Sequence, residues 1–101
     1  MSDTLEKLVE TIKTRKGRDV KLSYTAFLLS KGNNYCLNKL KEEISELEEA
    51  IKNQDNIKHE TADVIYHLLV TLESSGVNYN DVLLELKKRE GQSGLEEKKS
   101  R

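Results

Sequence analysis

Two pairs of acidic residues are the groups in this sequence best suited to chemistry. Glu43 and Glu46 stand three positions apart, and so do Glu60 and Asp63. On an α-helix, residues at this spacing lie about 60° apart around the axis, so each pair shares one face. An ionised carboxylate held among apolar groups is costly unless it is paired with a cation or bound to a metal. The surroundings of each pair therefore decide its role.

The second pair stands in the most apolar segment of the chain. Its apolar neighbours on the C-terminal side are Val64, Ile65, Leu68, Leu69 and Val70. If this segment forms a helical hairpin with the segment before it, the two acidic pairs face each other. Four converging carboxylates repel one another, and a divalent cation removes that repulsion. Oxygen ligands favour Mg²⁺, or alternatively Mn²⁺, over zinc. The predicted metal ligands are Glu43, Glu46, Glu60 and Asp63.

Other polar residues near these pairs have more than one interpretation. The first pair, taken alone, is also compatible with an ordinary solvated helix face. Lys39 lies between its members on the helical wheel, but one lysine cannot neutralise four carboxylates. His67 follows Asp63 by one turn, where it either orients that carboxylate or acts as an acid. The alternative for His67 is a hydrogen-bonded histidine at the edge of a bundle, and His59 is predicted at the surface.

Apolar spacing predicts helices that position these groups. Apolar residues at i, i+3, i+4 and i+7 indicate a helix over about 4–15, apolar 3-4-3-4 spacing indicates one over 33–52, and a mostly apolar segment indicates one over 56–75. Cap and stop residues bound a short helix over 24–30, which Gly32 ends, and a fifth helix that Asn78 and Asp81 open and Gly91 ends. Ser23 is a predicted N-cap, Asn53 a left-handed helix end and Asp55 the next N-cap. Tyr79 and Leu86 are expected to face inward. Because no segment alternates long enough to form a strand, we predict an all-α fold of four to five helices around a central antiparallel hairpin.

Size and composition exclude several classes of protein. A chain of 101 residues predicts one domain over 1–101, in which 91–101 is a polar tail. The chain has 17 basic and 18 acidic residues, a net charge of −1, which argues against nucleic-acid binding. It contains no apolar run of about 20 residues, so we expect no membrane span and a cytoplasmic protein. Cys36, the single cysteine, is expected to be a buried apolar residue.

The acidic motifs resemble those of a known superfamily. E-E-x-x-E at 42–46, followed one helix later by E-x-x-D at 60–63, is similar to the signature of the MazG-like all-α nucleoside-triphosphate pyrophosphatases. The chain more closely resembles the phosphoribosyl-ATP pyrophosphohydrolase family. The stretches that carry this resemblance are Ser23-Tyr24-Thr25 with Leu28, Leu29 and Gly32, then 39–46, ETADVIYHLLV at 60–70 and GQSGLEEKKSR at 91–101. It departs from the family at Lys41, Tyr35 and Leu22, where the family usually has Gly, a basic residue and Gly.

The resemblance implies a defined reaction. Members of this family hydrolyse the α–β phosphoanhydride of N1-(5-phosphoribosyl)-ATP to phosphoribosyl-AMP and pyrophosphate, the second step of L-histidine biosynthesis. It also implies Mg²⁺ bound by carboxylates that match the four named above, and a homodimer or higher homo-oligomer with sites near the subunit interface. A chain of this length matches the stand-alone form, without a fused cyclohydrolase. The nucleotide substrate would be the principal small-molecule partner.

Specific roles follow as hypotheses. Glu46, together with Glu43, is the predicted catalytic group, and Glu46 would accept the proton of the attacking water. Lys39 and Lys31 would hold phosphate oxygens. Further predicted substrate contacts are Tyr24, Thr25 and His67. On the resemblance alone, Lys98 and Arg101 of the tail would reach the substrate or a neighbouring subunit.

Two other functions compete with this hypothesis. A pyrophosphatase that removes non-standard or surplus nucleotides would have the same acidic site, so a panel of substrates is needed to distinguish it. A non-catalytic helical dimerisation module would carry its acidic residues as surface groups, and its thermal stability would not respond to Mg²⁺. That second alternative leaves Glu60 and Asp63, in a mostly apolar helix, without an explanation.

Overall fold

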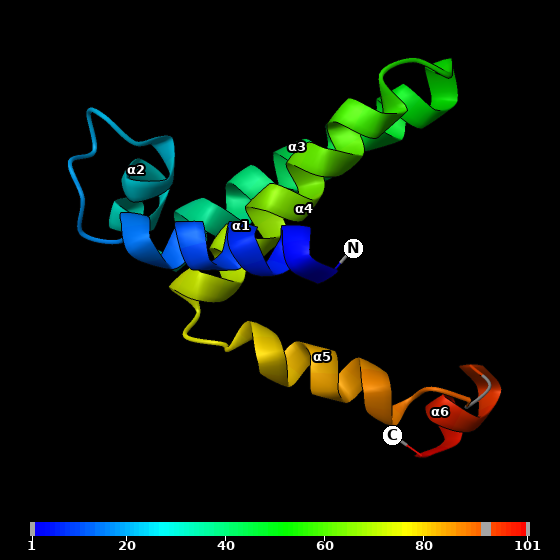
Figure 1. Ribbon diagram of the computed structural model, residues 1–101. Helices are drawn as coiled ribbons and strands as arrows, with labels where there is room; N and C mark the ends of the chain where they lie inside the picture. Colours follow the sequence, from blue (N-terminus) through cyan, green and yellow to red (C-terminus); the bar gives the residue numbers. More distant parts are fainter. Residues whose placement is uncertain (1, 92–93, 101) are drawn as a thin grey trace.

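The described part of the chain is built from α-helices. A computed structural model describes residues 2–91 and 94–100, and it contains no strand in those ranges (Figure 1). The helices are α1 Ser2–Arg15, α2 Tyr24–Lys31, α3 Asn33–Asn53, α4 Ile57–Ser74, α5 Tyr79–Lys88 and α6 Gly94–Ser100. The predicted all-α fold is confirmed, and the first five helices lie close to the predicted ranges. The sixth was missed because its segment has too few apolar residues to show a helical period.

The long helices α3 and α4 form the predicted antiparallel hairpin. Helices α1 and α2 pack across the end of this hairpin where α3 begins and α4 finishes, so that α4 contacts three other helices (Figure 1). This arrangement agrees with the sequence, because α4 is apolar around most of its circumference and must be covered on several sides. The hairpin continues well beyond α1 and α2 toward the turn that joins its two helices.

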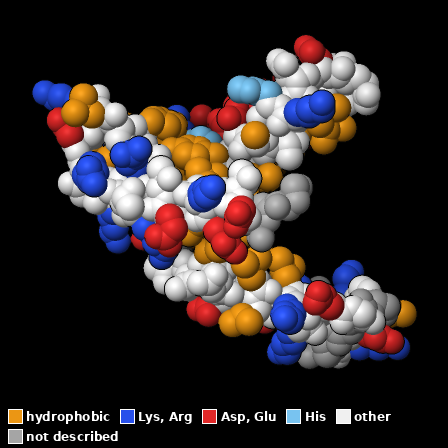
Figure 2. All heavy atoms as spheres, viewed as in Figure 1, with side chains coloured by type: hydrophobic (Ala, Val, Ile, Leu, Met, Phe, Trp, Pro, Cys, Tyr) orange, Lys and Arg blue, Asp and Glu red, His pale blue; other side chains and the backbone are white. Residues whose placement is uncertain are grey.

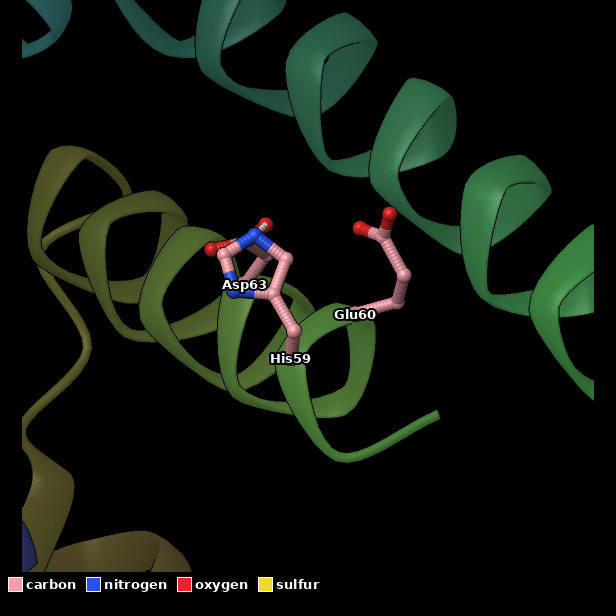
Figure 3. A group of neighbouring side chains, drawn as sticks. All are labelled: His59, Glu60 and Asp63. Carbon is pink, nitrogen blue, oxygen red and sulfur yellow. Dashed lines mark ion pairs between the residues drawn. The ribbon is translucent and has the colours of Figure 1, made fainter. Parts of the chain in front are cut away.

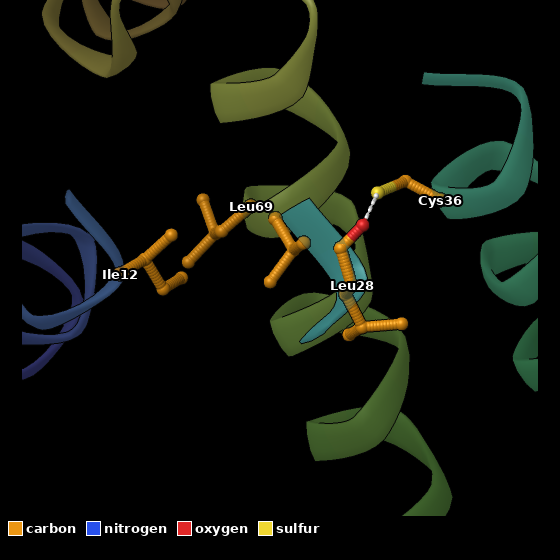
Figure 4. Packing of buried hydrophobic residues seen from close by; sticks show 5 residues of the cluster. Ile12, Leu28, Cys36 and Leu69 are labelled. Carbon is orange, nitrogen blue, oxygen red and sulfur yellow. Dashed lines mark hydrogen bonds between the residues drawn. The ribbon is translucent and has the colours of Figure 1, made fainter. Parts of the chain in front are cut away.

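The core lies where these four helices meet. Each helix contributes to a cluster of buried side chains, namely Ile12, Leu28, Cys36, Leu69 and Val70 (Figure 4). The thiol of Cys36 donates a hydrogen bond to the Leu28 carbonyl oxygen at 3.2 Å, which joins α3 to α2. Cys36 is therefore a buried free cysteine, as predicted. This packing fixes how the start of α3 and the end of α4 sit against each other.

The local signals for helix ends were partly correct. The Ser23 hydroxyl caps α2 by accepting a hydrogen bond from the Ala26 backbone N–H at 3.0 Å, as predicted. The turn between α3 and α4 differs from the prediction by one residue. Asn53 stays helical, and Gln54 takes the left-handed conformation at φ 54°. The Asp55 N–H closes the end of α3 on the Ala50 carbonyl oxygen at 3.0 Å, so Asn56 rather than Asp55 precedes α4.

Helix α5 extends away from the bundle. The radius of gyration is 15.5 Å, whereas a compact domain of this length would have about 13 Å. Tyr79, at the start of α5, packs against the core, but Leu84 and Leu86 are 63% and 57% exposed. The prediction that Leu86 faces inward is therefore wrong, because α5 leaves the bundle after its first turn (Figure 1). Across the described ranges, no helix is both long and apolar enough to cross a membrane.

Candidate metal centre

The hairpin brings the four predicted carboxylates into one cluster. Oxygen atoms of Glu43, Glu46 and Glu60 lie within 4.8 Å of one another, and Glu60 also lies within that distance of ligand atoms of Asp63 and His59. Glu60 belongs to both groups and therefore links the pair on α3 to the pair on α4. Figure 3 shows the Glu60 carboxylate directed toward α3 and the Asp63 carboxylate beside the His59 ring.

The cluster carries an excess of negative charge. The pKa of Glu43 is raised to about 7, first by burial and then by the hydrogen bond with Glu46 and by repulsion from Glu46, Asp63 and Glu60. A carboxyl with this pKa holds a proton for much of the time at neutral pH. The proton partly offsets the repulsion among the four groups. A divalent cation would offset it more fully, because it carries two charges and interacts with several oxygens at once.

Two basic side chains lie near the cluster, and in the described part of the chain neither forms an ion pair with Glu43, Glu46 or Glu60. Lys39 lies one turn before Glu43, but its Nζ atom pairs with Glu42 Oε1 at 3.4 Å, and Glu42 points to solvent. His59 Nε2 lies 3.3 Å from Asp63 Oδ2. His59 is exposed, as predicted, but sequence reasoning did not connect it with the site. Its spacing of four residues before Asp63 on a helix was the available signal.

An open cleft adjoins the cluster on the side of the hairpin turn. It has a volume of about 260 Å³ and lies between α3 and α4 beside Glu46 and Glu60. Apart from Ala50, acidic and amide side chains line the rest of it, including Glu49 and Asn53. The oxygen donors of the cluster and of this cleft match the ligands of a hard divalent cation. On the face shown in Figure 2, acidic and histidine side chains gather along the hairpin beside apolar groups.

Aromatic side chains border the cluster on the opposite side. Tyr24 is 54% exposed, and its ring lies nearly parallel to that of Tyr66, with centroids 6.5 Å apart. The hydroxyl groups of Thr25 and Tyr66 hydrogen-bond each other. His67 is 7% exposed, packs edge-on against both tyrosines, and has a pKa lowered by burial. Of the predicted substrate contacts on these elements, Tyr24 presents the accessible surface. His67 packs against its ring, and Thr25 is joined to the neighbouring Tyr66.

The remaining predicted contacts lie in two different places. Lys31, the last residue of α2, and Lys39, on α3, are both near the ring of Tyr35. Lys98 lies on α6, which the chain reaches only after α5 has left the bundle, so within one copy it stands away from the hairpin (Figure 1). Arg101 lies outside the described residues.

Comparisons with known proteins agree on one family. A profile of the family described as phosphoribosyl-ATP pyrophosphohydrolase matches residues 5–90. A protein of Paracoccus denitrificans named phosphoribosyl-ATP pyrophosphatase is 48% identical over 99 residues, which cover 96% of this chain and 92% of the relative. A protein of the same name from Dechloromonas aromatica is 46% identical over 101 residues, covering 98% and 94%. One from Dinoroseobacter shibae is 48% identical, covering 96% and 97%.

Proposed function

The chain belongs to the phosphoribosyl-ATP pyrophosphohydrolase family. On that premise we propose that it hydrolyses phosphoribosyl-ATP to phosphoribosyl-AMP and pyrophosphate in histidine biosynthesis. The proposal includes Mg²⁺ held by the carboxylate cluster. The observation that carries this proposal is the convergence of Glu43, Glu46 and Glu60 within 4.8 Å, together with the raised pKa of Glu43. Acidic groups brought this close without neutralising partners are costly for the fold. A cation-dependent activity explains why the chain nonetheless brings them together.

The donor set fits Mg²⁺. All four proposed ligands offer oxygen atoms, and the cluster is open to solvent on one side, which leaves room for water and phosphate in the coordination shell. Mn²⁺ suits the same ligands, and the imidazole of His59 would fit it better than Mg²⁺. When bound, the cation would neutralise phosphate charge and lower the pKa of a water molecule. The carboxylates would hold the cation between α3 and α4.

Glu46 is the proposed general base. It is the more exposed member of its pair and lies next to the cleft, so a water molecule can approach its carboxylate from solvent. Glu43 is more buried and hydrogen-bonds Glu46, which would orient the Glu46 carboxylate and take part in metal binding. The attacking water would transfer its proton to Glu46 as the bond between water oxygen and phosphorus forms and the bridging P–O bond of the α–β phosphoanhydride breaks, which releases pyrophosphate from phosphoribosyl-AMP.

The rest of the substrate would contact the aromatic side of the cluster. The exposed ring of Tyr24, with His67 packed against it, would contact the base or ribose of the nucleotide. Thr25, beside Tyr66, would lie next to that contact. Lys39 and Lys31 would hold phosphate oxygens. Lys98 would reach the substrate only in another subunit, because α6 lies away from the hairpin of its own chain.

A homodimer would cover the apolar surface that one copy leaves exposed. Ile44, Ile51 and Leu68 on the hairpin are each more than 40% exposed, as are Leu84 and Leu86 on α5. Burying such side chains against a second copy would favour association. Light scattering on the purified protein should give twice the mass of one chain, and Ile44→Asp with Ile51→Asp should give a monomer. A wild-type protein that stays monomeric at high concentration would contradict the proposed dimer.

The activity test uses purified protein, phosphoribosyl-ATP and Mg²⁺. The wild-type protein should release pyrophosphate, and EDTA should stop the release. Glu43→Ala and Asp63→Ala should abolish turnover while the far-ultraviolet circular dichroism stays helical. Glu48→Ala is the matched control, because Glu48 is an exposed carboxylate on α3 that pairs with Lys52 instead of joining the cluster. Full activity in Glu43→Ala or Asp63→Ala would overturn the proposed metal site.

A substrate panel tests the specificity. With phosphoribosyl-ATP, ATP and deoxynucleoside triphosphates compared at equal concentration, phosphoribosyl-ATP should have the highest kcat/KM. A higher kcat/KM for a deoxynucleoside triphosphate would instead identify a pyrophosphatase that removes surplus nucleotides through the same cluster.

A further inference from the structure

Two lysine side chains from different helices share one aromatic ring. The Nζ atom of Lys31 lies 5.4 Å from the centroid of Tyr35, and the Nζ atom of Lys39 lies 5.6 Å from the same centroid. Lys31 also lies 5.9 Å from the ring of Phe27. Cations within about 6 Å of a ring centroid are attracted to the negative face of the ring. Tyr35 therefore attracts the ammonium groups of both lysines, one from α2 and one from α3.

The ring itself is firmly placed. Tyr35 is half-buried, packs against the core, and lies edge-on to Phe27 with centroids 5.8 Å apart. Phe27 in turn packs against the same core from α2. The packing of α2 on α3 thus fixes the ring that both ammonium groups face.

Tyr35 also lies on the same face of α3 as the carboxylates. At 100° per residue, Tyr35, Lys39, Glu43 and Glu46 fall within an arc of about 80°, and Tyr35 precedes Glu43 by about 12 Å along the helix axis. This stripe of α3 therefore has Tyr35, the ring that both lysines face, at one end and two of the proposed metal ligands at the other, with Lys39 between them. A substrate that carries phosphoryl groups at two places would match both ends.

The charges of this pair are incompletely neutralised. Lys39 has an exposed partner in Glu42 at 3.4 Å, and such surface ion pairs are weak and easily exchanged. Lys31 makes no ion pair with any side chain that the structure describes. Two ammonium groups held at one ring leave a positive potential that an incoming phosphate would neutralise.

We propose that Tyr35 is a positioning residue, which holds Lys31 and Lys39 as a pair that binds a phosphoryl group of the substrate outside the metal centre. This inference rests on the proposed function for the identity of the substrate. The phosphoryl group is either the monoester on the second ribose or part of the departing pyrophosphate. Pre-organising the two lysines reduces the side-chain entropy lost when the phosphate binds, so the effect of Tyr35 should appear in binding and not in the chemical step.

The test compares Tyr35→Leu with Tyr35→Phe. Tyr35→Leu removes the ring and should raise KM for phosphoribosyl-ATP roughly fivefold, since two exposed cation–π contacts are lost, while kcat changes less than twofold. Tyr35→Phe keeps the ring and should retain the wild-type KM. Tyr79→Leu is the matched control, because Tyr79 packs against the same core from α5. If Tyr79→Leu raises KM as much as Tyr35→Leu, or if Tyr35→Phe does not preserve it, the inference is wrong.

A binding measurement separates this inference from the proposed function. Calorimetric titration with pyrophosphate and with phosphoribosyl-AMP, each in Mg²⁺, needs no turnover. Tyr35→Leu should weaken one of the two ligands about fivefold, and the ligand that is weakened identifies the phosphoryl group. Unchanged affinity for both would overturn the role of Tyr35, even if the wild-type protein hydrolyses phosphoribosyl-ATP. Absence of that hydrolysis would overturn the proposed function but leave the pyrophosphate titration as a test of Tyr35.

Discussion

The two ends of the α3–α4 hairpin differ in what they are built to do. At the covered end, residues 33–40 and 67–74, α1 and α2 bury Cys36 and Val70 almost completely. At the open end, residues 43–53 and 57–65, Ile44 and Ile51 are about half exposed and the carboxylates repel one another. The same two helices thus supply stability at one end and a strained charge cluster at the other. Because the covered end fixes the helices, the open end can keep its acidic groups together without contributing to stability itself.

The largest expected effect belongs to the open end and concerns activity. Glu60→Gln removes the charge of the residue that belongs to both groups of the cluster. Turnover of phosphoribosyl-ATP should fall roughly a thousandfold, because a metal held by fewer carboxylates stabilises the transition state less. The thermal midpoint measured in EDTA should not fall, since one source of repulsion is gone. A variant that loses activity and stability together would show that the open end also supports the fold.

At the covered end the expected effect is on stability. Leu28→Ala removes a side chain with 0% exposure from the core, and the free energy of unfolding should fall by about 3 kcal/mol. Leu22→Ala makes the same chemical change at an 86% exposed position before α2, and it should change that free energy by less than about 0.5 kcal/mol. Urea denaturation followed by circular dichroism measures both. Equal losses in the two variants would contradict the division between the ends.

The difference between the two ends explains how much of the fold could be predicted from the sequence. Apolar periodicity predicted α1, α3 and α4, which bury apolar faces, because burial imposes the spacing that sequence analysis detects. Cap and turn residues predicted α2 and α5. Sequence analysis missed α6, which buries no apolar face. It also predicted that Leu86 faces inward, because an amphipathic pattern does not show whether another part of the same chain covers the apolar face. The one-residue error at the hairpin turn arose because Asp55 uses its backbone N–H to close α3, a competition that residue preferences do not describe.

For the site, spacing predicted which carboxylates share a face but not how their partners are arranged. The two acidic pairs meet because the hairpin is antiparallel, which the short turn implied. The pairing of Lys31 and Lys39 on Tyr35 depends on the packing of α2 on α3, and the burial of His67 depends on the rings around it. Contacts that depend on how helices pack leave no periodic signal in the sequence. Sequence analysis can therefore identify these residues as candidates but cannot predict which of them contact one another.

Metal binding should distinguish the two ends of the hairpin, because the proposed ligands lie at the open end only. At ten times its Kd, Mg²⁺ should raise the free energy of unfolding of the wild-type protein by about 1.4 kcal/mol. Leu28→Ala should gain the same amount from a lower starting value, because its cluster is intact. Glu60→Gln should gain little at that Mg²⁺ concentration. Thermal denaturation across a Mg²⁺ series tests this, and an equal gain in all three proteins would mean that Mg²⁺ acts elsewhere.

The smallest expected effect is a dependence of stability on pH, because Glu43 is only partly buried and solvent screens its charge. Its folded-state pKa of about 7 lies above the ordinary value of 4.5, so the folded protein binds more protons than the unfolded chain between these values. The free energy of unfolding in EDTA should therefore fall as the pH rises from about 4.5 to 7. Glu43→Gln cannot titrate and should flatten this slope, whereas Leu28→Ala should keep it. Mg²⁺ should also flatten the wild-type slope by favouring the ionised carboxylate. If the free energy of unfolding in EDTA rose toward pH 7 instead, ionisation of the cluster would stabilise the fold, and the open end would not need a cation.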